Sequence, residues 1–155
     1  MPKENSILIE KWADGQEIYE LQTQPVLEIP EPEICNVLVV GSTGVGKSTY
    51  LNSLVNELMG VEMNDHFRYV IVKDALVEGF TSSTTEVNIY GFPKQGNMKK
   101  AVRLIDVPGL GDTGGLKKDK ENIQKIKNKI EQSIPFLNLI VYVFKSTETR
   151  ITKEN

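Results

Sequence analysis

The chain has 155 residues, enough for one domain with a sizeable core. It is 39% hydrophobic and 25% charged, and its net charge of −3 argues against non-specific nucleic-acid binding, which usually needs a basic excess. The single cysteine, Cys35, excludes an intrachain disulfide and fits a reducing compartment. The sequence contains neither a secretory signal nor a membrane-spanning run, so we expect a cytoplasmic protein, with any membrane association through regions outside this chain.

Residues 1–33 are expected to form an N-terminal arm followed by an acidic, proline-rich linker. Ile7–Ile9 and Ile18–Leu21 are short strand candidates on either side of a turn at Asp14-Gly15. Prolines and glutamates then alternate, which is typical of a stiff linker: Pro25, Glu28, Pro30, Glu31, Pro32 and Glu33. We place the main domain at residues 34–155.

The first elements of this domain are a strand and a helix. Residues 34–40 are apolar and rich in β-branched side chains, as in a strand buried on both faces. After a glycine-rich loop, residues 48–59 carry leucines and a valine at helical spacing, and Gly60 is the expected end of the helix. Residues 69–72 allow a strand or a helical turn, and residues 81–85 contain only serine and threonine.

The second half of the domain continues the alternation of strands and helices. Residues 86–92 and 101–107 are strand candidates that a hairpin at 93–100 would join. Residues 117–134 have isoleucines at helical spacing with lysines on the other face, and residues 136–144 are a buried-strand candidate. This order predicts a three-layer α/β domain whose sheet is mostly parallel with one antiparallel edge strand.

The glycine-rich loop is the most specific signal in the chain. Residues 41–48, Gly-Ser-Thr-Gly-Val-Gly-Lys-Ser, lie between a predicted strand and a predicted helix, which is the context of a phosphate-binding P-loop. Glycines let backbone N–H groups point at an anion, and the start of the helix adds its positive end. Lys47, expected at the surface of the loop, would contact the β- and γ-phosphates, and the Ser48 hydroxyl would ligate Mg²⁺.

We therefore predict nucleotide contacts from most of this loop: Gly41, Thr43, Gly44, Val45, Gly46, Lys47, Ser48 and Thr49. The alternative is a glycine-rich turn between strand and helix that binds nothing.

A second group of candidates follows the strand at 101–107. The sequence Asp-Val-Pro-Gly at 106–109 could place Asp106 on Mg²⁺, usually through water, and the Gly109 N–H on the γ-phosphate. A simple turn is the alternative interpretation. Thr84, with Thr85 as its close alternative, would complete the Mg²⁺ shell, unless residues 81–85 are only a solvated loop. The predicted metal ligands are thus Ser48, Thr84, Thr85 and Asp106. The predicted catalytic residues are Lys47 and Thr84.

With these residues the chain resembles the GTPase branch of the P-loop proteins. Within that branch it is similar to the AIG/GIMAP-type GTPases and to their septin and chloroplast-import-receptor relatives. Residues 41–49, 106–113 and 150–154 carry the resemblance, which spans 34–155; the last stretch, Arg-Ile-Thr-Lys-Glu, resembles an Arg-aromatic-Thr-x-Glu signature. The resemblance implies GTP/GDP and Mg²⁺ binding, slow hydrolysis and nucleotide-controlled dimers or oligomers, often at membranes.

Two features depart from this family. GTPases usually select guanine with Asn/Thr-Lys-x-Asp on a later strand, but the nearest sequence, Asn-Lys-Ile-Glu at 128–131, falls in a predicted helix and reads as a solvated face. We therefore expect a domain that is incomplete at its C-terminus, without the base-specificity strand, and the choice between guanine and adenine stays open. In addition, Leu110 follows Gly109 where many GTPases carry a glutamine that orients water.

The function favoured by these features is a switch or assembly GTPase with slow, Mg²⁺-dependent hydrolysis. The alternatives are an ATP-using P-loop enzyme and a non-enzymatic interaction module with a degenerate site. The threonine loop and the Asp-x-Pro-Gly sequence favour the GTPase, since a kinase would need lid arginines and the chain has only Arg68, Arg103 and Arg150.

Overall fold

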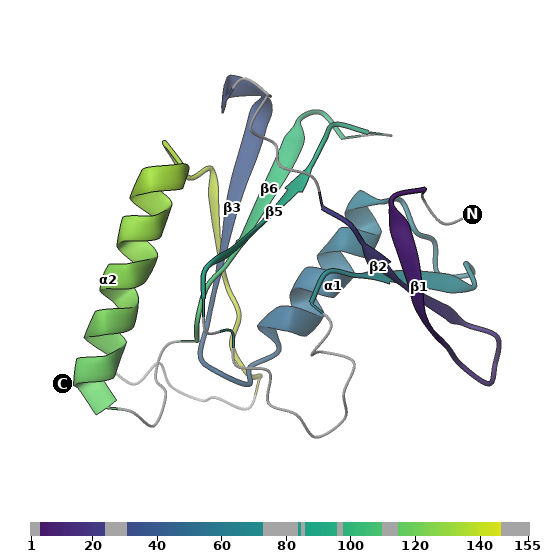
Figure 1. Ribbon diagram of the computed structural model, residues 1–155, viewed down its shortest axis with the longest axis horizontal. Coiled ribbons are helices and arrows are strands. Elements are labelled where there is room, and N and C mark those ends of the chain that lie inside the picture. Colours follow the sequence, from purple (N-terminus) through teal and green to yellow (C-terminus); the bar gives the residue numbers. More distant parts are fainter. Residues whose placement is uncertain are drawn as a thin grey trace.

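A computed structural model of the chain describes residues 4–23, 31–72, 84, 86–95, 98–109 and 115–146. In chain order the elements are β1 (Ser6–Lys11), β2 (Glu17–Leu21), a short 3-10 helix (Glu31–Glu33), β3 (Ile34–Val40), α1 (Lys47–Leu58), β4 (Phe67–Val70), β5 (Asn88–Phe92), β6 (Ala101–Asp106), α2 (Gly115–Ser133) and β7 (Leu139–Tyr142) (Figure 1). Neither of the two described helices has the length and apolar character needed to span a bilayer.

The central sheet has four strands in the order β5-β6-β3-β7. Strand β3 pairs in parallel with β6 on one side and with β7 on the other, whereas β5 pairs antiparallel with β6 at one edge. The prediction of a mostly parallel sheet with one antiparallel edge strand is therefore confirmed.

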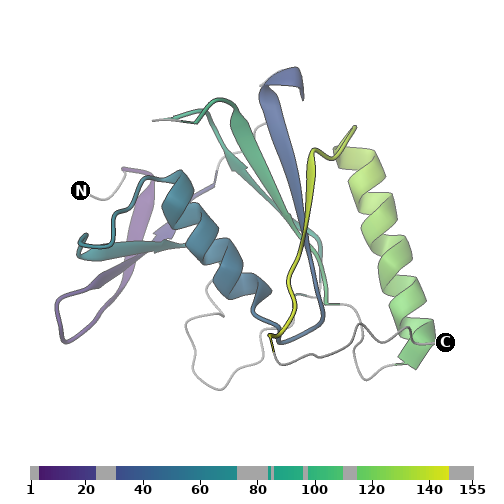
Figure 2. The same ribbon diagram turned by 180° about the vertical axis from the view of Figure 1, so that it is seen from behind.

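Helices cover both faces of this sheet, as Figure 2 shows from behind. On one face, Leu51 and Val55 of α1 pack in a cluster with Val39 of β3, and all three side chains are fully buried. On the other face, Ile126 and Ile130 of α2, and Ile134 just after the helix, pack in a cluster that contains Ile105 of β6. Alternate residues of each strand thus meet opposite helices, because successive side chains of a strand point to opposite faces. The three layers expected from the order of elements are present.

Helix α1 ends at the predicted glycine. Gly60 has a φ of 69°, and its N–H donates to the Glu57 carbonyl at 3.0 Å, while the Val61 N–H donates to the Asn56 carbonyl at 2.9 Å. These two bonds satisfy carbonyls that the end of a helix would leave without partners, and a left-handed residue is required between them.

A second sheet, of three strands in the order β1-β2-β4, lies on the far side of α1 (Figure 1). Strands β1 and β2 form the predicted hairpin around Asp14-Gly15, and β2 pairs in parallel with β4. Of the two alternatives for residues 69–72, the strand is therefore the one observed, at Phe67–Val70. Leu21 and Tyr69 of this sheet are buried in the cluster that contains Leu51 of α1, so the hairpin packs onto the domain. The boundary at residue 33 stays a prediction.

Two asparagines of α1 close the outer edge of β4. Asn56 accepts from the Tyr69 N–H at 2.8 Å and donates to the Tyr69 carbonyl at 2.8 Å. One turn earlier, Asn52 accepts from the N–H groups of Ile71 and Val72 and donates to the Val72 carbonyl at 3.0 Å. These amides pair the backbone N–H and C=O groups at the edge of β4, as a neighbouring strand would. They also attach the second sheet to α1, the helix that follows the glycine loop.

Strand β7 lies within the predicted range of 136–144, but the expectation that it is buried is wrong. Leu139, Ile140 and Tyr142 are 51%, 59% and 53% exposed. The strand is at the edge of the described sheet, and α2 packs against clusters centred on β3 and β6. The start of β7 is nevertheless fixed to β3, because the Asn36 N–H donates to Asn138 Oδ1 at 2.7 Å and the Asn138 N–H donates to the Asn36 carbonyl at 2.9 Å.

Candidate nucleotide-binding site

The glycine-rich loop connects the end of β3 to the start of α1. Gly44 and Gly46 have φ values of 72° and 99°, in the left-handed region that favours glycine. Gly46 is the N-cap of α1 and gives no side-chain cap, and the first turn of the helix has no acidic residue. The positive end of the helix is therefore not neutralised by the protein's own side chains, which suits a phosphate group.

Lys47 is buried, at 7% exposure, so the expectation that it lies at the surface of the loop is wrong. Its Nζ donates to the carbonyls of Gly41 and Ser42, at 3.3 Å and 3.4 Å. The side chain thus folds back over the loop from the first residue of α1. A lysine is costly to bury unless its charge is compensated, and the two carbonyls and the nearby Asp106 carboxylate contribute to that compensation.

The remaining loop residues differ in how far they are exposed. Ser48 and Thr49 lie in the first turn of α1, with Ser48 half-buried and Thr49 exposed. Thr43 and Val45 are half-buried, and Gly44 is exposed. Ser48 is therefore on the same turn as Lys47, where its hydroxyl can serve a cation that accompanies the phosphates.

Gly41 allows a close approach that the motif alone does not reveal. A Cβ at Gly41 would collide with the carbonyl oxygen of Val143 and would lie 3.3 Å from its carbonyl carbon. The Val143 N–H in turn donates to the Val40 carbonyl at 2.8 Å. The chain just after β7 therefore lies against the first residue of the loop, and a side chain at position 41 would push it away.

The segment after β6 lies against the same loop. A Cβ at Gly109 would lie 2.6 Å from the Thr43 nitrogen and 2.8 Å from the Thr43 Cα, and it would also collide with the Thr43 hydroxyl. Two backbones come this close only where one residue has no side chain. The structure therefore brings the predicted contacts at residue 109 and in the loop into one place.

Asp106, the last residue of β6, is 1% exposed. The Thr84 hydroxyl donates to Asp106 Oδ2 at 3.1 Å, so the predicted metal ligands from two distant segments are in contact. Burial raises the pKa of Asp106, and the Thr84 hydrogen bond, the Lys47 charge and the nearby Val107 N–H oppose that shift.

The other carboxylate oxygen of Asp106 indicates what the site lacks. Oδ1 is buried and has no hydrogen-bond partner among the described residues. Buried polar atoms are nearly always paired, and an unpaired one in a native fold commonly marks a bound ion or water. Asp106, Thr84 and Ser48 supply the oxygen ligands that Mg²⁺ prefers, so these residues fit the ion. Among the described residues there is no group of three or more His, Cys, Asp or Glu that could hold a metal by itself.

Some sequence candidates lie elsewhere or outside the described residues. Residues 128–131 fall within α2, where Asn128 accepts from Gln124 Nε2 at 2.8 Å, so the helix-surface interpretation is confirmed. Thr85, Leu110 and Arg150 lie outside the described residues. The approach of Val143 to Gly41 and the role of Asn52 were missed, although two asparagines spaced by one helical turn on α1 were a visible signal.

A buried lysine folded over a glycine loop, with an aspartate, a threonine and a glycine from later segments close by, defines a P-loop nucleoside-triphosphate site. Comparison with known proteins narrows the class. Residues 36–155 match the family described as 50S ribosome-binding GTPase, and the chain belongs to that family. It is a P-loop GTPase domain, and the family implies binding of guanine nucleotide.

A curated relative agrees with this assignment. GTP-binding protein A of Dictyostelium discoideum is 31% identical over 150 residues, which cover 94% of this chain and 29% of the relative. The chain thus spans less than a third of that protein's length. Both matches support the P-loop GTPases as a class and do not single out the AIG/GIMAP type.

Proposed function

We propose that this chain binds GTP together with Mg²⁺, hydrolyses it slowly, and acts as a nucleotide-controlled switch or assembly GTPase. The observation that carries the proposal is the buried Asp106, whose Oδ1 lacks a partner among the described residues while Oδ2 accepts from Thr84. Buried polar atoms in native folds are nearly always paired. A buried carboxylate oxygen that lacks a partner beside a phosphate loop therefore fits a site that binds a metal ion together with a nucleotide.

The chain's own groups divide the work of binding. Backbone N–H groups at the start of α1 would bind the phosphates, and Lys47 would turn from its two long carbonyl bonds to the β- and γ-oxygens. The Gly109 N–H would contact the γ-phosphate from the segment that lies against Thr43. When bound, Mg²⁺ supplies further charge neutralisation, with Ser48, Asp106 and Thr84 or Thr85 holding it directly or through water.

Switching follows from where these contacts originate. In the proposed complex, the segments of Thr84 and Gly109 would both approach the γ-phosphate, whereas the glycine loop would contact the other phosphates as well. Loss of the γ-phosphate would release the contacts of these two segments first. In this proposal, the contacts of the residues that precede β5 and follow β6 therefore differ between the GTP-bound and GDP-bound states.

Slow turnover is proposed from what the site lacks. Lys47 neutralises only part of the charge that develops in the transition state, and the sequence has Leu110 where a water-orienting group is needed. We therefore propose that a second copy of the chain supplies the missing catalytic group, with Arg150, Thr84 or Thr85 as candidates, as the AIG/GIMAP-type resemblance implies. We also propose that the protein acts in the cytoplasm.

Titration with fluorescently labelled GTP and ATP at matched Mg²⁺ tests the nucleotide part of this proposal. We expect GTP to bind with Mg²⁺, and the preference over ATP to be weak, because the 155-residue sequence has no Asn/Thr-Lys-x-Asp motif on a strand. Binding of ATP far above GTP would favour the ATP-using enzyme. Failure to bind either nucleotide would favour the interaction module with a degenerate site.

Turnover measured across a wide range of protein concentration, with light scattering in parallel, tests the catalytic part. The rate per chain is expected to be low in dilute, monomeric samples and to rise as scattering reports association. Fast hydrolysis by a strictly monomeric sample would contradict the shared-site proposal, and would indicate a water-positioning residue within the chain.

A further inference from the structure

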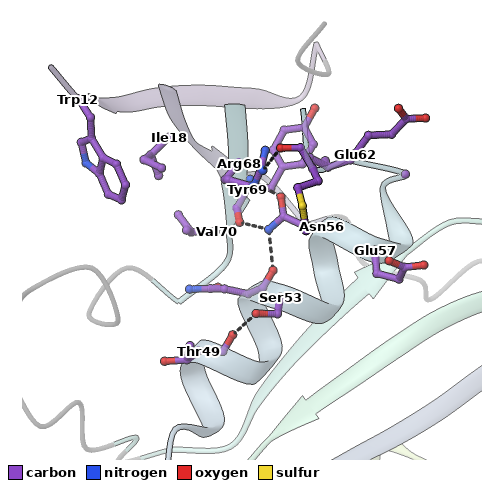
Figure 3. A pocket seen from close by; sticks show the side chains of 14 residues that line it. Trp12, Ile18, Thr49, Ser53, Asn56, Glu57, Glu62, Arg68, Tyr69 and Val70 are labelled. Carbon is purple, nitrogen blue, oxygen red and sulfur yellow. Dashed lines mark hydrogen bonds between the residues drawn. The ribbon is translucent and has the colours of Figure 1, made fainter. Parts of the chain in front are cut away.

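A groove separate from the nucleotide site lies between α1 and the three-stranded sheet (Figure 3). It encloses about 1040 Å³, at the upper end of the roughly 300–1,000 Å³ typical of small-molecule pockets. It lies along the side of α1 opposite Leu51 and Val55, which pack toward the central sheet. Its other walls come from β2, β4, the turn between β1 and β2, and the connection from α1 to β4.

The walls combine a buried apolar surface with exposed apolar side chains. Ile18 and Val70 are 3% and 4% exposed, whereas Trp12 and Met63 are 45% and 90% exposed. In Figure 3 the Trp12 ring hangs from the hairpin on the same side as Ile18 and Val70. Tryptophan and methionine left open to solvent beside a hollow are the residues that anchor protein partners.

Most polar groups in the groove are already engaged. Arg68 donates to the main-chain carbonyls of Met63, Asp65 and Phe67, at 2.9, 2.8 and 2.6 Å. The amides of Asn52 and Asn56 bind the edge of β4. The edge that a peptide strand could extend is therefore closed at this point, which leaves side-chain packing as the way to fill the groove.

The rim of the groove is acidic. Glu57 and Glu62 are exposed, and neither forms an ion pair with another described residue. Among the described residues that line the groove, Arg68 is the one basic side chain, and its contacts to three carbonyls hold it in the loop that ends at Phe67. An occupant with positive charge at its margins would therefore be complementary to the rim.

We propose that this groove docks an amphipathic helix of a partner protein. Apolar side chains of that helix would pack on the exposed Trp12 and Met63, above the buried Ile18 and Val70. Its lysines or arginines would face Glu57 and Glu62. This helix-in-groove mode uses both the apolar wall and the acidic rim, which a strand or a small anion would not. The inference goes beyond the proposed GTPase activity and does not rest on it.

Trp12 makes the test direct, because it is the single tryptophan of the chain. The full chain is titrated with a synthetic helical peptide of leucine and lysine, roughly five turns long, at about 3.6 residues per turn. A matched peptide carries glutamate at every lysine position. We expect the lysine peptide to shift Trp12 emission to the blue, saturably, and to bind at least ~10-fold more tightly than the glutamate peptide.

Substitutions locate the binding surface. Glu57→Gln together with Glu62→Gln should weaken the lysine peptide about fivefold, an effect of the size expected for two rim charges, near 1 kcal/mol. Glu121→Gln with Glu131→Gln, on the exposed surface of α2, is the matched control and should leave affinity unchanged. Ser53→Arg, which places a bulky cation in the groove, should abolish binding measured by the anisotropy of a labelled peptide.

Several results would overturn the proposal. Equal binding of the two peptides, an unchanged Trp12 spectrum at saturation, or equal losses in the groove and α2 variants would each show that the peptide does not occupy this groove. A blue shift that appears on raising protein concentration alone, with a doubled mass in light scattering, would assign the groove to a second copy instead. Lys47→Ala should not change peptide affinity, so loss of the nucleotide site and loss of the groove are distinguishable.

Discussion

The two strand ends that form the nucleotide site differ in how complete they are without ligand. The loop after β3 is shaped mainly by local features, although Val143 also lies against Gly41. These features are two glycines in the left-handed region, an uncapped helix start, and Lys47 held by carbonyls of the same loop. The end of β6 depends on distant partners, because Asp106 receives Thr84 from an earlier segment and Gly109 lies against Thr43.

This difference suggests that the end of β3 binds the phosphates and that the end of β6 responds to Mg²⁺ and the γ-phosphate. A preformed loop can hold phosphate groups with little rearrangement, whereas a buried carboxylate with one oxygen lacking a partner gains most from a cation. The β3 side should therefore set the affinity for any polyphosphate. The β6 side should set the dependence on Mg²⁺ and on the γ-phosphate.

Lys47→Ala should have the largest effect, because it removes the cation that contacts the phosphates. Loss of a hydrogen bond to a charged group costs about 1.5–3 kcal/mol, which corresponds to roughly 10- to 150-fold in triphosphate affinity. The loss should appear with and without Mg²⁺. Fluorescent-nucleotide titration measures it, and Lys47→Met, which keeps the buried stem, should lose a similar amount. A variant that binds GTP as well as the parent would remove the loop from the site.

Asp106→Asn should remove most of the gain in affinity that Mg²⁺ provides, roughly tenfold or about 1.4 kcal/mol, and should leave binding in chelator unchanged. The same change should raise the melting temperature of the nucleotide-free protein, because a neutral amide is less costly to bury than a carboxylate lacking a partner. Ser48→Ala should show the Mg²⁺ effect without the stabilisation. Equal losses with and without chelator would reject the metal role.

Gly109→Ala should weaken the binding of triphosphate more than that of diphosphate, by about fivefold, since the new methyl group pushes the segment away from the loop. Thr43→Gly should not restore affinity, because the added Cβ would also lie 2.6 Å from the Thr43 backbone nitrogen. Titration with GDP and a non-hydrolysable GTP analogue provides the comparison. Full rescue by Thr43→Gly would show that the side chain is the only obstacle.

Thr84→Val should have the smallest effect. It removes the hydroxyl that donates to Asp106 Oδ2 while keeping the shape of the side chain. A single hydrogen bond contributes about 0.5–1.5 kcal/mol, so a two- to tenfold loss of Mg²⁺-dependent affinity is expected. The double variant Thr84→Val, Asp106→Asn should lose no more than Asp106→Asn alone. Additive losses would place the two residues in separate roles.

The same contrast explains what could be predicted from sequence. Strand β3 spans the predicted residues, and the helix that follows ends before Gly60, because local spacing and glycine conformations determine them. Thr84 and Asp106 were predicted only as ligands of one Mg²⁺, their direct hydrogen bond was not predicted, and no local signal chose Thr84 over Thr85. Long-range contacts such as Val143 with Gly41 leave no pattern in the sequence.

Strands β3 and β7 show a second limit. Both are short apolar runs, yet Val39 is fully buried and Ile140 is 59% exposed. Burial depends on what lies beside a strand, and β7 is an edge strand in the described sheet. Likewise, the strand candidates around the turn predicted β1 and β2, but the pairing of β2 with β4 joins residues far apart in the chain. Asn52 and Asn56 of α1 bind the other edge of β4.

The central claim is that the ends of β3 and β6 form one Mg²⁺–nucleotide site. The most direct test is the affinity of the full chain for a fluorescent, non-hydrolysable GTP analogue, measured with Mg²⁺ and with chelator, in the parent, in Asp106→Asn and in Glu131→Gln as a distant control. We predict that Mg²⁺ tightens binding in the parent and in Glu131→Gln but not in Asp106→Asn. Affinity that is indifferent to Mg²⁺ in the parent, or tightened equally in Asp106→Asn, would contradict the account.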